Sequence, residues 1–175
     1  APAVAVRADV SVEAEVLALF AAADELGPLA VLVNNAGITG PPARVDELTA
    51  DRIERLLAVN VLGSFLCARE AVRRMSTNHG GTGGVIVNLS SAAARIGSPG
   101  EYVDYAATKG AVDTLTLGLS KEVAAEGIRV NAVRPGLIKT EIHAGGGQPD
   151  RIEQRRATVP MQRGGEAIEV AQAIA

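Results

Sequence analysis

The sequence predicts an α/β fold with a doubly wound parallel sheet, and three observations indicate it. Short apolar runs rich in β-branched residues alternate along the chain with longer segments of helical spacing, the order of elements in such folds. The run Val85–Leu89 is too short for a helix and is typical of a strand buried on both faces of a parallel sheet. Hydrophobic residues make up 47% of the chain and aromatic ones only 2%, so small aliphatic side chains must pack the helices onto the sheet.

Size, charge and cysteine content narrow the class of protein. A chain of 175 residues suits one domain. The net charge of −3, with both signs interspersed, offers no basic stripe, so we expect no nucleic-acid partner. Cys67 is the only cysteine, which excludes a disulfide framework and predicts no metal site. Neither an apolar run of ~20 residues nor a signal peptide is present, so we expect a cytoplasmic protein with no membrane partner.

The first part of the chain is predicted to hold two strands separated by a helix. A short strand is expected over residues 4–10, with an acid near its carboxyl end, and a helix with regular apolar spacing is expected over 11–26. A second buried strand, 29–33, runs into two amides, a methyl group and a glycine, which let the backbone lie close to a flat ligand. A plain strand-to-loop turn is the alternative interpretation of these residues, Asn34, Asn35, Ala36 and Gly37.

The longest helical pattern runs from residue 49 to about residue 75 and contains Asn60. This amide lies between apolar residues on a largely buried helix, where it must find hydrogen-bond partners or cost a few kcal/mol. Two interpretations stay open. Either the amide satisfies a neighbouring backbone carbonyl, or it holds a water molecule against Lys109.

The second half of the chain repeats the alternation of strand and helix. His79 opens a glycine-rich segment that follows a helix and precedes a strand, the reverse of a dinucleotide fingerprint, so we expect a solvated connector. Three consecutive glycines predict that 143–150 is a mobile loop or lid, with His143 solvated. The remaining elements predicted here are a strand over 85–89, a helix from about 102 to Gly127, a strand over 128–133 and a helix over 165–175.

The candidate catalytic residues follow the strand over 85–89. Ser91 stands at the carboxyl end of that strand, where open α/β sheets bind ligands. Tyr105 and Lys109 follow on one helix at i, i+4 spacing, which places phenol and ammonium on one face. A free Tyr has a pKa near ~10 and is a poor base, but a neighbouring cation favours the phenolate. A serine that orients a substrate oxygen beside such a tyrosine suits interconversion of an alcohol and a carbonyl.

Taken together, these residues resemble the short-chain dehydrogenase/reductase family in its shorter form, and most closely its glucose/ribitol-dehydrogenase-like branch. The resemblance covers nearly the whole chain and implies a Rossmann-type fold and an NAD or NADP cofactor. Its motifs occur in the family's order and spacing: Asp9-Val10, Asn34-Asn35-Ala36-Gly37, Asn60-Val61-x-Gly63, Ser91, Tyr105-x-x-x-Lys109 and Pro135-Gly136-x-Ile138-x-Thr140.

The resemblance also implies a role for each residue. Tyr105 would be the acid/base, Lys109 would lower its pKa and hold the nicotinamide ribose, Ser91 would orient the substrate oxygen, and Asn60 would position a water in the proton relay. The residues implied for cofactor binding are Asp9 and Val10 at the adenine, Asn35, Ala36 and Gly37 at the adenosine ribose, Pro135, Gly136, Ile138 and Thr140 at the nicotinamide, together with Tyr105 and Lys109.

One part of the family pattern, its opening strand, glycine-rich turn and helix, does not occur in the sequence. That segment seats the pyrophosphate on a helix N-terminus. We count four strands where the fold needs seven. We therefore expect residues 1–175 to be the interior part of one dinucleotide-binding oxidoreductase domain, inactive as a free-standing chain.

The expected function is that of an NAD(P)-dependent oxidoreductase interconverting a secondary alcohol and a ketone, assembled as a homodimer or homotetramer. A catalytically idle dinucleotide-binding or sensing protein on the same fold is the alternative, which the complete set of four catalytic residues disfavours. A serine hydrolase built on Ser91 is a further alternative. It lacks a G-x-S-x-G turn, and neither histidine lies in a segment expected to reach the serine.

Overall fold

A three-stranded parallel sheet forms the centre of the computed structural model, which describes residues 3–175. The strands are β1 (Val31–Asn34), β2 (Gly84–Leu89) and β3 (Ile128–Val133), in the order β1-β2-β3. Val31 pairs with Val85, and Gly84 pairs with Ile128, so all three strands end at the same edge of the sheet. The predicted α/β class and parallel sheet are therefore confirmed.

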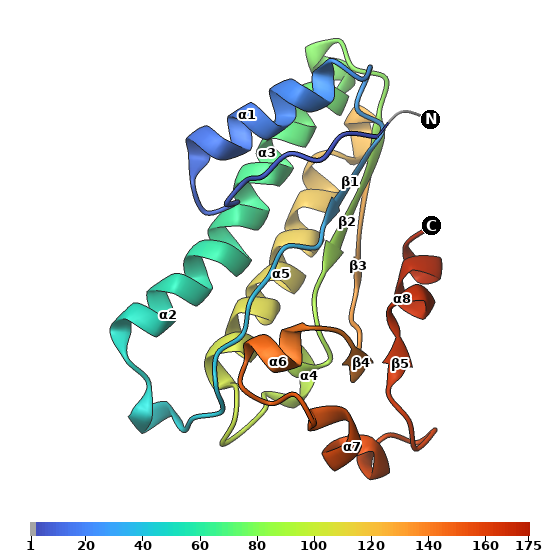
Figure 1. Cartoon of the computed structure of the whole chain (residues 1–175). Coiled ribbons are helices and arrows are strands. Elements are labelled where there is room, and N and C mark those ends of the chain that lie inside the picture. Colours follow the sequence, from blue (N-terminus) through green and yellow to red (C-terminus); the bar gives the residue numbers. More distant parts are fainter. Residues whose placement is uncertain (1–2) are drawn as a thin grey trace.

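Four of the five longest helices lie on one side of this sheet (Figure 1). They are α1 (Glu13–Asp24), α2 (Ala50–Leu57), α3 (Gly63–Met75) and α5 (Val103–Glu122), whereas α8 (Ala167–Ile174) lies on the other side. The main core fills the space between the sheet, α1 and α3 and extends to the end of α5. Its buried members are Val16, Phe20, Leu66, Cys67, Ala71, Met75, Ile86, Val123, Ile128 and Val130.

The predicted helix over 49–75 is one rod that changes its winding in the middle. α2 passes into a π-helical turn, Ala58–Leu62, and this turn leads directly into α3. Thr49 begins the rod as its N-cap, because its side chain accepts a hydrogen bond from the N–H of Arg52 at 3.3 Å. A single π turn inside an α-helix shifts the phase of the side chains that follow it and is frequent at functional sites.

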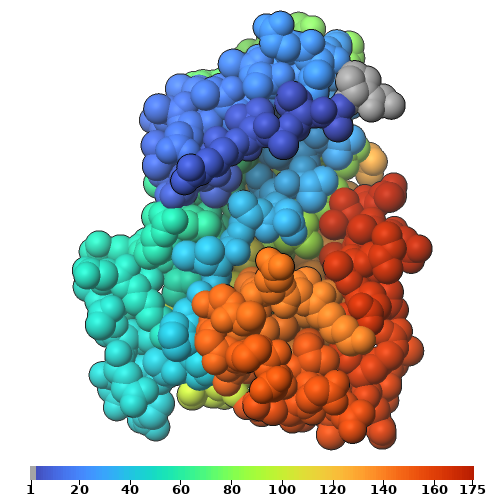
Figure 2. All heavy atoms as spheres, in the orientation of Figure 1, coloured from blue at the N-terminus to red at the C-terminus, as the bar shows by residue number. Residues whose placement is uncertain are grey.

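The segment after β3 is built from short elements. These are β4 (Ile138–Lys139), α6 (Ile142–Gly145), α7 (Arg151–Arg155) and β5 (Gly165–Glu166), and α4 (Ala93–Ile96) lies near them. β4 and β5 pair in parallel as a second small sheet. The loop predicted over 143–150 is wrong at its start, because His143 lies in α6 and is half-buried, its Nε2 2.9 Å from the carbonyl oxygen of Ile138. In Figure 2 this segment, coloured orange and red, covers one side of the molecule.

The strand predicted over residues 4–10 is not formed. The described part of this segment has no strand pairing and runs as an extended trace beside α1 before Asp9 and Val10 turn into the helix. A β-strand needs a neighbour to bind its backbone N–H and C=O groups. In the described residues β1 pairs only with β2, so residues 3–9 have no strand beside them. Apolar sequence alone did not reveal this, because pairing depends on the partner.

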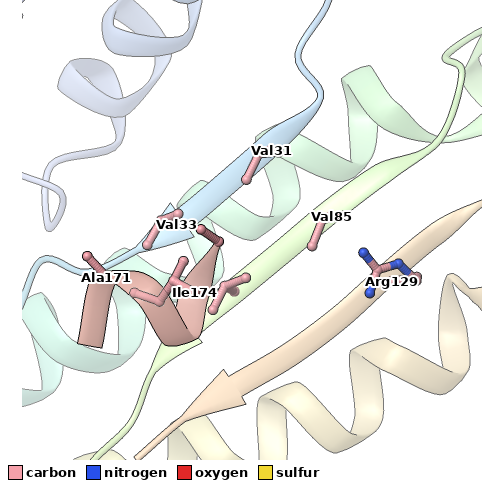
Figure 3. A pocket seen from close by; sticks show the side chains of 8 residues that line it. Val31, Val33, Val85, Arg129, Ala171 and Ile174 are labelled. Carbon is pink, nitrogen blue, oxygen red and sulfur yellow. The ribbon is translucent and has the colours of Figure 1, made fainter. Parts of the chain in front are cut away.

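One face of the sheet is only partly covered, which corrects the prediction that the strands are buried on both faces. Val31 and Val33 of β1 are 53% and 39% exposed. With Val85 and Val87 they line an open hollow of about 420 Å³, bounded by Arg129 and by the end of α8 (Figure 3). β2 matches the prediction better, because its last four residues are buried. In β3, buried residues alternate with exposed ones over its first four positions.

Within residues 3–175, the helices include none with the length and apolar character needed to cross a bilayer.

Candidate active site

The carboxyl end of β2 places Ser91 at the edge of the sheet where the three strands end. Ser90 follows β2 and donates its N–H to the carbonyl of Val133 at 2.9 Å. Ser91 accepts a hydrogen bond from the N–H of Ala93 at 3.1 Å, which orients the serine side chain at the start of α4. The N–H of Ala92 bonds the carbonyl of Pro135 at 2.9 Å. The ends of β2 and β3 are thereby held side by side.

Tyr105 lies in the first turn of α5 and is half-buried. Burial raises the pKa of its phenol above the ordinary value of 10.0, and a hydrogen bond with Ser91 opposes that rise. The predicted neighbourhood of Ser91 and Tyr105 is therefore present in the structure. The phenol stays protonated at neutral pH in this arrangement.

Lys109 lies one turn further along α5 and is 5% exposed. Its Nζ donates to the carbonyl of Leu89 at 2.7 Å and lies 5.7 Å from the centroid of the Tyr105 ring. Burial lowers the pKa of Lys109 from 10.5 to about 8, so the ammonium still predominates at pH 7. The expectation that Lys109 lowers the pKa of Tyr105 stays a prediction. The phenol's pKa rises, because burial outweighs its hydrogen bond with Ser91, and the ammonium faces a carbonyl.

Asn60 lies in the π turn and is fully buried. Its Oδ1 accepts from the N–H of Ile38 at 2.8 Å, and its Nδ2 donates to the carbonyl of Ile38 at 2.9 Å and to Thr108 Oγ1 at 3.1 Å. Both N–H donors of the amide are therefore occupied. Of the two interpretations, the structure favours the one in which the side chain satisfies backbone groups. The water-holding role stays a prediction and would have to use other atoms of this residue.

Gly37 allows the backbone after β1 to lie close to Asn60 and Lys109. A Cβ at this position would lie 3.3 Å from both Asn60 Oδ1 and Lys109 Nζ, tighter than most such contacts. The glycine that ends the predicted ligand-binding motif thus lies directly against the candidate catalytic residues. In residues 3–175 Lys109 Nζ donates to Leu89 alone, so two of its three N–H donors are free for another acceptor.

Three of the residues expected at the adenosine end lie together near β1. Val10, Asn35 and Ala36 line a common cavity of about 280 Å³ beside α1 and β1. The carboxylate of Asp9 accepts from the N–H and hydroxyl of Ser11, at 2.9 and 2.6 Å, and from Arg55 at 3.0 Å. These bonds lower its pKa to about 2, so Asp9 is ionised and fixed in place.

The residues expected at the nicotinamide end lie on the segment after β3. Pro135 lies beside Ser91 through its bond to Ala92, as described above. Ile138 is half-buried in β4, whereas Gly136 and Thr140 are exposed. They share the segment that leads from the end of β3 into α6, next to the predicted catalytic residues.

The arrangement matches a known family of oxidoreductases. A family model described as enoyl-(acyl carrier protein) reductase matches residues 1–175. An uncharacterized oxidoreductase of Escherichia coli, YgfF, is 63% identical over 169 residues, which are 96% of this chain and 68% of that protein. The chain belongs to the short-chain dehydrogenase/reductase family. Glucose 1-dehydrogenase 2 of Bacillus subtilis is 37% identical over 99% of this chain and 66% of its own length, so the chain spans about two thirds of these relatives.

Solved structures agree with the fold and with the family. The 3-ketoacyl-(acyl-carrier-protein) reductase of Brucella melitensis, complexed with NADH, superposes with a TM-score of 0.89 at 33% identity, covering 98% of this chain and 69% of that one. ElxO with NADP bound gives a TM-score of 0.82 at 34% identity, covering 95% and 66%. Both relatives hold a nicotinamide cofactor, which bears on the function proposed below.

Sequence reasoning missed several residues that hold the site together. Ile38 and Thr108 are the partners of Asn60, and Arg52 and Asp104 form an ion pair beside Tyr105. An acidic residue in the first turn of the tyrosine helix was a visible signal. Its partner lies 52 residues away, so no local pattern identifies it. In the part of the chain that the structure describes, no group of three His, Cys, Asp or Glu residues is placed to hold a metal ion.

Proposed function

We propose that this protein interconverts a secondary alcohol and a ketone with NAD or NADP, and that Tyr105 transfers the proton. One observation carries the proposal. The phenol of Tyr105 lies close enough to Ser91, at the edge where the parallel strands end, for the serine to lower the pKa of the phenol, and Lys109 lies one turn away with free donors. Membership of an oxidoreductase family, and the NADH and NADP bound by the solved relatives, support the same reaction class.

The residues divide the work as follows. Ser91 donates a hydrogen bond to the substrate oxygen and holds it beside the phenol. In ketone reduction Tyr105 donates its proton to that oxygen, and in alcohol oxidation the phenolate takes the proton back. A protonated Tyr105, as its raised pKa implies, is ready for the reducing direction at neutral pH. The nicotinamide, when bound, supplies or accepts the hydride.

The chain's own residues fit such a cofactor. Lys109 has two donors free for ribose hydroxyls, and Gly37 leaves the space in front of it unblocked by a side chain. Val10, Asn35 and Ala36 line the cavity on the adenosine side. We therefore assign these residues to cofactor binding, with Asp9, Pro135, Gly136, Ile138 and Thr140 as further candidates. The choice between NAD and NADP, the homo-oligomeric state and the cytoplasmic location stay predictions.

The residues of the site fit the alternative functions less well. An idle dinucleotide-binding or sensing protein has no need of Ser91 and Tyr105 side by side. A serine hydrolase needs a histidine beside Ser91. His79 is exposed in a turn, and the Nε2 of His143 lies 2.9 Å from the carbonyl oxygen of Ile138. Neither ring is engaged with the serine.

The test compares the chain's only two tyrosines. The full-length protein is screened with secondary alcohols, polyols, sugars and β-keto thioesters and with both cofactors, and the best substrate is used for Tyr105→Phe and Tyr102→Phe. Loss of the proton donor should lower the turnover of Tyr105→Phe by on the order of 10²–10⁴-fold, with cofactor affinity nearly unchanged. Tyr102→Phe removes a hydroxyl that bonds Gln148 and should keep most of its turnover. A Tyr105→Phe variant as active as Tyr102→Phe would reject the proposal.

A further inference from the structure

Arg52, in the first turn of α2, holds three separate segments together. Its Nε donates to Asp104 Oδ2 at 2.7 Å, and its Nη2 lies 3.3 Å from Asp104 Oδ1. Its Nη1 donates to the carbonyl of Pro41 at 2.6 Å. The two charged side chains are enclosed, 17% and 4% exposed. Arg52 thus binds the first turn of α5 by a two-point ion pair, which fixes orientation as well as distance, and binds the loop after β1 by a hydrogen bond.

The loop is shaped to accept this guanidinium. A Cβ at Gly40 would lie 2.9 Å from Cζ of Arg52, closer than real Cβ contacts, and 3.0 Å from its Nε, tighter than most of them. Only a residue without a side chain lets the loop lie flat on the guanidinium. The position of the Arg52 guanidinium therefore depends on Gly40. A substitution at this uncharged residue can displace the guanidinium without changing any charge.

Asp104 connects the ion pair directly to Tyr105. Its Oδ1 accepts a hydrogen bond from the backbone N–H of Tyr105 at 2.8 Å. The backbone carbonyl of Tyr105 accepts from Thr108 Oγ1 at 2.8 Å, and Thr108 in turn accepts from Asn60. Both backbone polar groups of Tyr105 are therefore held by side chains that are themselves bound to the α2–π-turn segment.

The two connections join the same pair of elements. Asn60 links Ile38 to Thr108, and Arg52 links Pro41 to Asp104, so each spans from the loop after β1 to the start of α5. Tyr105 lies between the two points of attachment on α5. A single attachment would leave the first helical turn free to pivot, whereas two fix its direction.

The ion pair between Arg52 and Asp104 fixes local geometry more than it raises the stability of the fold. Removing two charges from water costs about as much as their attraction returns, so an enclosed pair adds little net stability over an apolar one. What it provides is a fixed arrangement of donors and acceptors. Catalytic geometry is sensitive at this scale, because a misplacement of about 1 Å can cost ~10²-fold in rate.

We propose that Arg52 and Asp104 are positioning residues for Tyr105: their ion pair fixes the first turn of α5 so that the phenol stays next to Ser91. This inference rests on the proposed function, in which Tyr105 transfers the proton. Neither residue needs to touch the substrate or cofactor to act.

Three variants break the ion pair in different ways. Arg52→Gln removes the cation, Asp104→Asn removes the anion but keeps an acceptor for the Tyr105 N–H, and Gly40→Ala displaces the guanidinium without changing charge. Each should lower kcat by about 10- to 100-fold, with KM for the cofactor nearly unchanged. The double variant Arg52→Gln/Asp104→Asn should be no slower than the slower single variant, because either change already breaks the pair.

Titration of Tyr105 separates positioning from a simple charge effect. The Cζ resonance of ¹³C-labelled tyrosine reports the pKa of the phenol, and Tyr105→Phe assigns the signal. Loss of the Ser91 hydrogen bond should raise this pKa in all three variants, because that bond lowers it in the intact protein. A charge effect alone would raise the pKa in Arg52→Gln and lower it in Asp104→Asn. Shifts of opposite sign would therefore overturn the proposal.

Asp24→Asn serves as the matched control. Asp24 forms a two-point ion pair with Arg74, at 2.7 and 2.8 Å, which joins α1 to α3 away from Tyr105. This variant should change thermal stability but neither kcat nor the Tyr105 titration. If Asp104→Asn behaves like Asp24→Asn, the pair at Tyr105 is only structural and the inference fails. If Tyr105→Phe keeps its turnover, the proposed function fails, while the titrations still show whether the ion pair positions the phenol.

Discussion

Ser91, Tyr105 and Lys109 were predictable as a group, because their proximity depends on a strand end and on one helical turn. The partners of their neighbours were not. Asn60 binds residues 22 and 48 positions away, so its environment follows only from the assembled fold. The direction in which the pKa of Tyr105 shifts could not be predicted from the sequence either. It depends on how deeply the phenol is buried, and that burial comes from elements distant in the chain.

Lys109 makes the stability of the folded chain depend on pH. Burial lowers its pKa from 10.5 to about 8, a difference that corresponds to roughly 3 kcal/mol. Between these two pH values the unfolded chain still holds a proton that the folded chain has released, so stability rises with pH across this window. The pKa of Tyr105 is raised above 10.0, so this residue destabilises the folded chain only above about pH 10.

We therefore expect the urea midpoint to rise between pH 8 and pH 10, and Lys109→Met to remove most of that rise. The carbonyl of Leu89 loses its partner in this variant, which lowers stability at all pH values without producing a slope. Lys121→Met, on the exposed part of the same helix, is the control and should keep the rise. An equal rise in Lys109→Met would show that the buried ammonium is not its source.

At the scale of elements, prediction succeeded where a segment's own pattern decides its structure. The strand over 128–133 was predicted to the residue, and the helix with Tyr105 was predicted within a few positions. It failed over 4–10, because no strand in the described residues pairs with this segment. Prediction also failed at α6, where the start of a glycine-rich segment that was predicted to be a loop forms a short helix. The π turn at Ala58–Leu62 leaves no simple mark in the apolar spacing.

Gly63 constrains the packing of α3 at the scale of elements. It begins the helix directly after the π turn, and a Cβ there would lie 2.6 Å from Cγ2 of Val10. Gly63→Ala should lower the free energy of unfolding by about 1–3 kcal/mol through overpacking, measured by urea denaturation. In a Val10→Ala background the obstructing methyl is gone, so the same change should cost clearly less. Equal costs in both backgrounds would mean that this contact does not limit the packing.

At the scale of the whole molecule, apolar side chains remain exposed on two of the long helical elements. Ile53, Leu57 and Phe65 on the α2–α3 rod are 37%, 45% and 50% exposed, and Leu117 on α5 is 58% exposed. A Cβ at Gly118 would meet no atom within 4 Å, so this part of α5 offers a flat surface. Exposed apolar surface of this kind, on helices that can pack closely, is typical of protein–protein contacts.

We expect these surfaces to join copies of the protein into a homodimer or homotetramer. A stable contact needs about 800 Å² from each partner, an area that two long helical elements can supply. Phe65→Glu and Leu117→Glu place a charge in the contact, so light scattering should report a smaller mass for each variant than for the parent protein. Leu17→Glu changes a leucine of similar exposure on α1 and should leave the mass unchanged. A parent protein that is already monomeric would contradict the expectation.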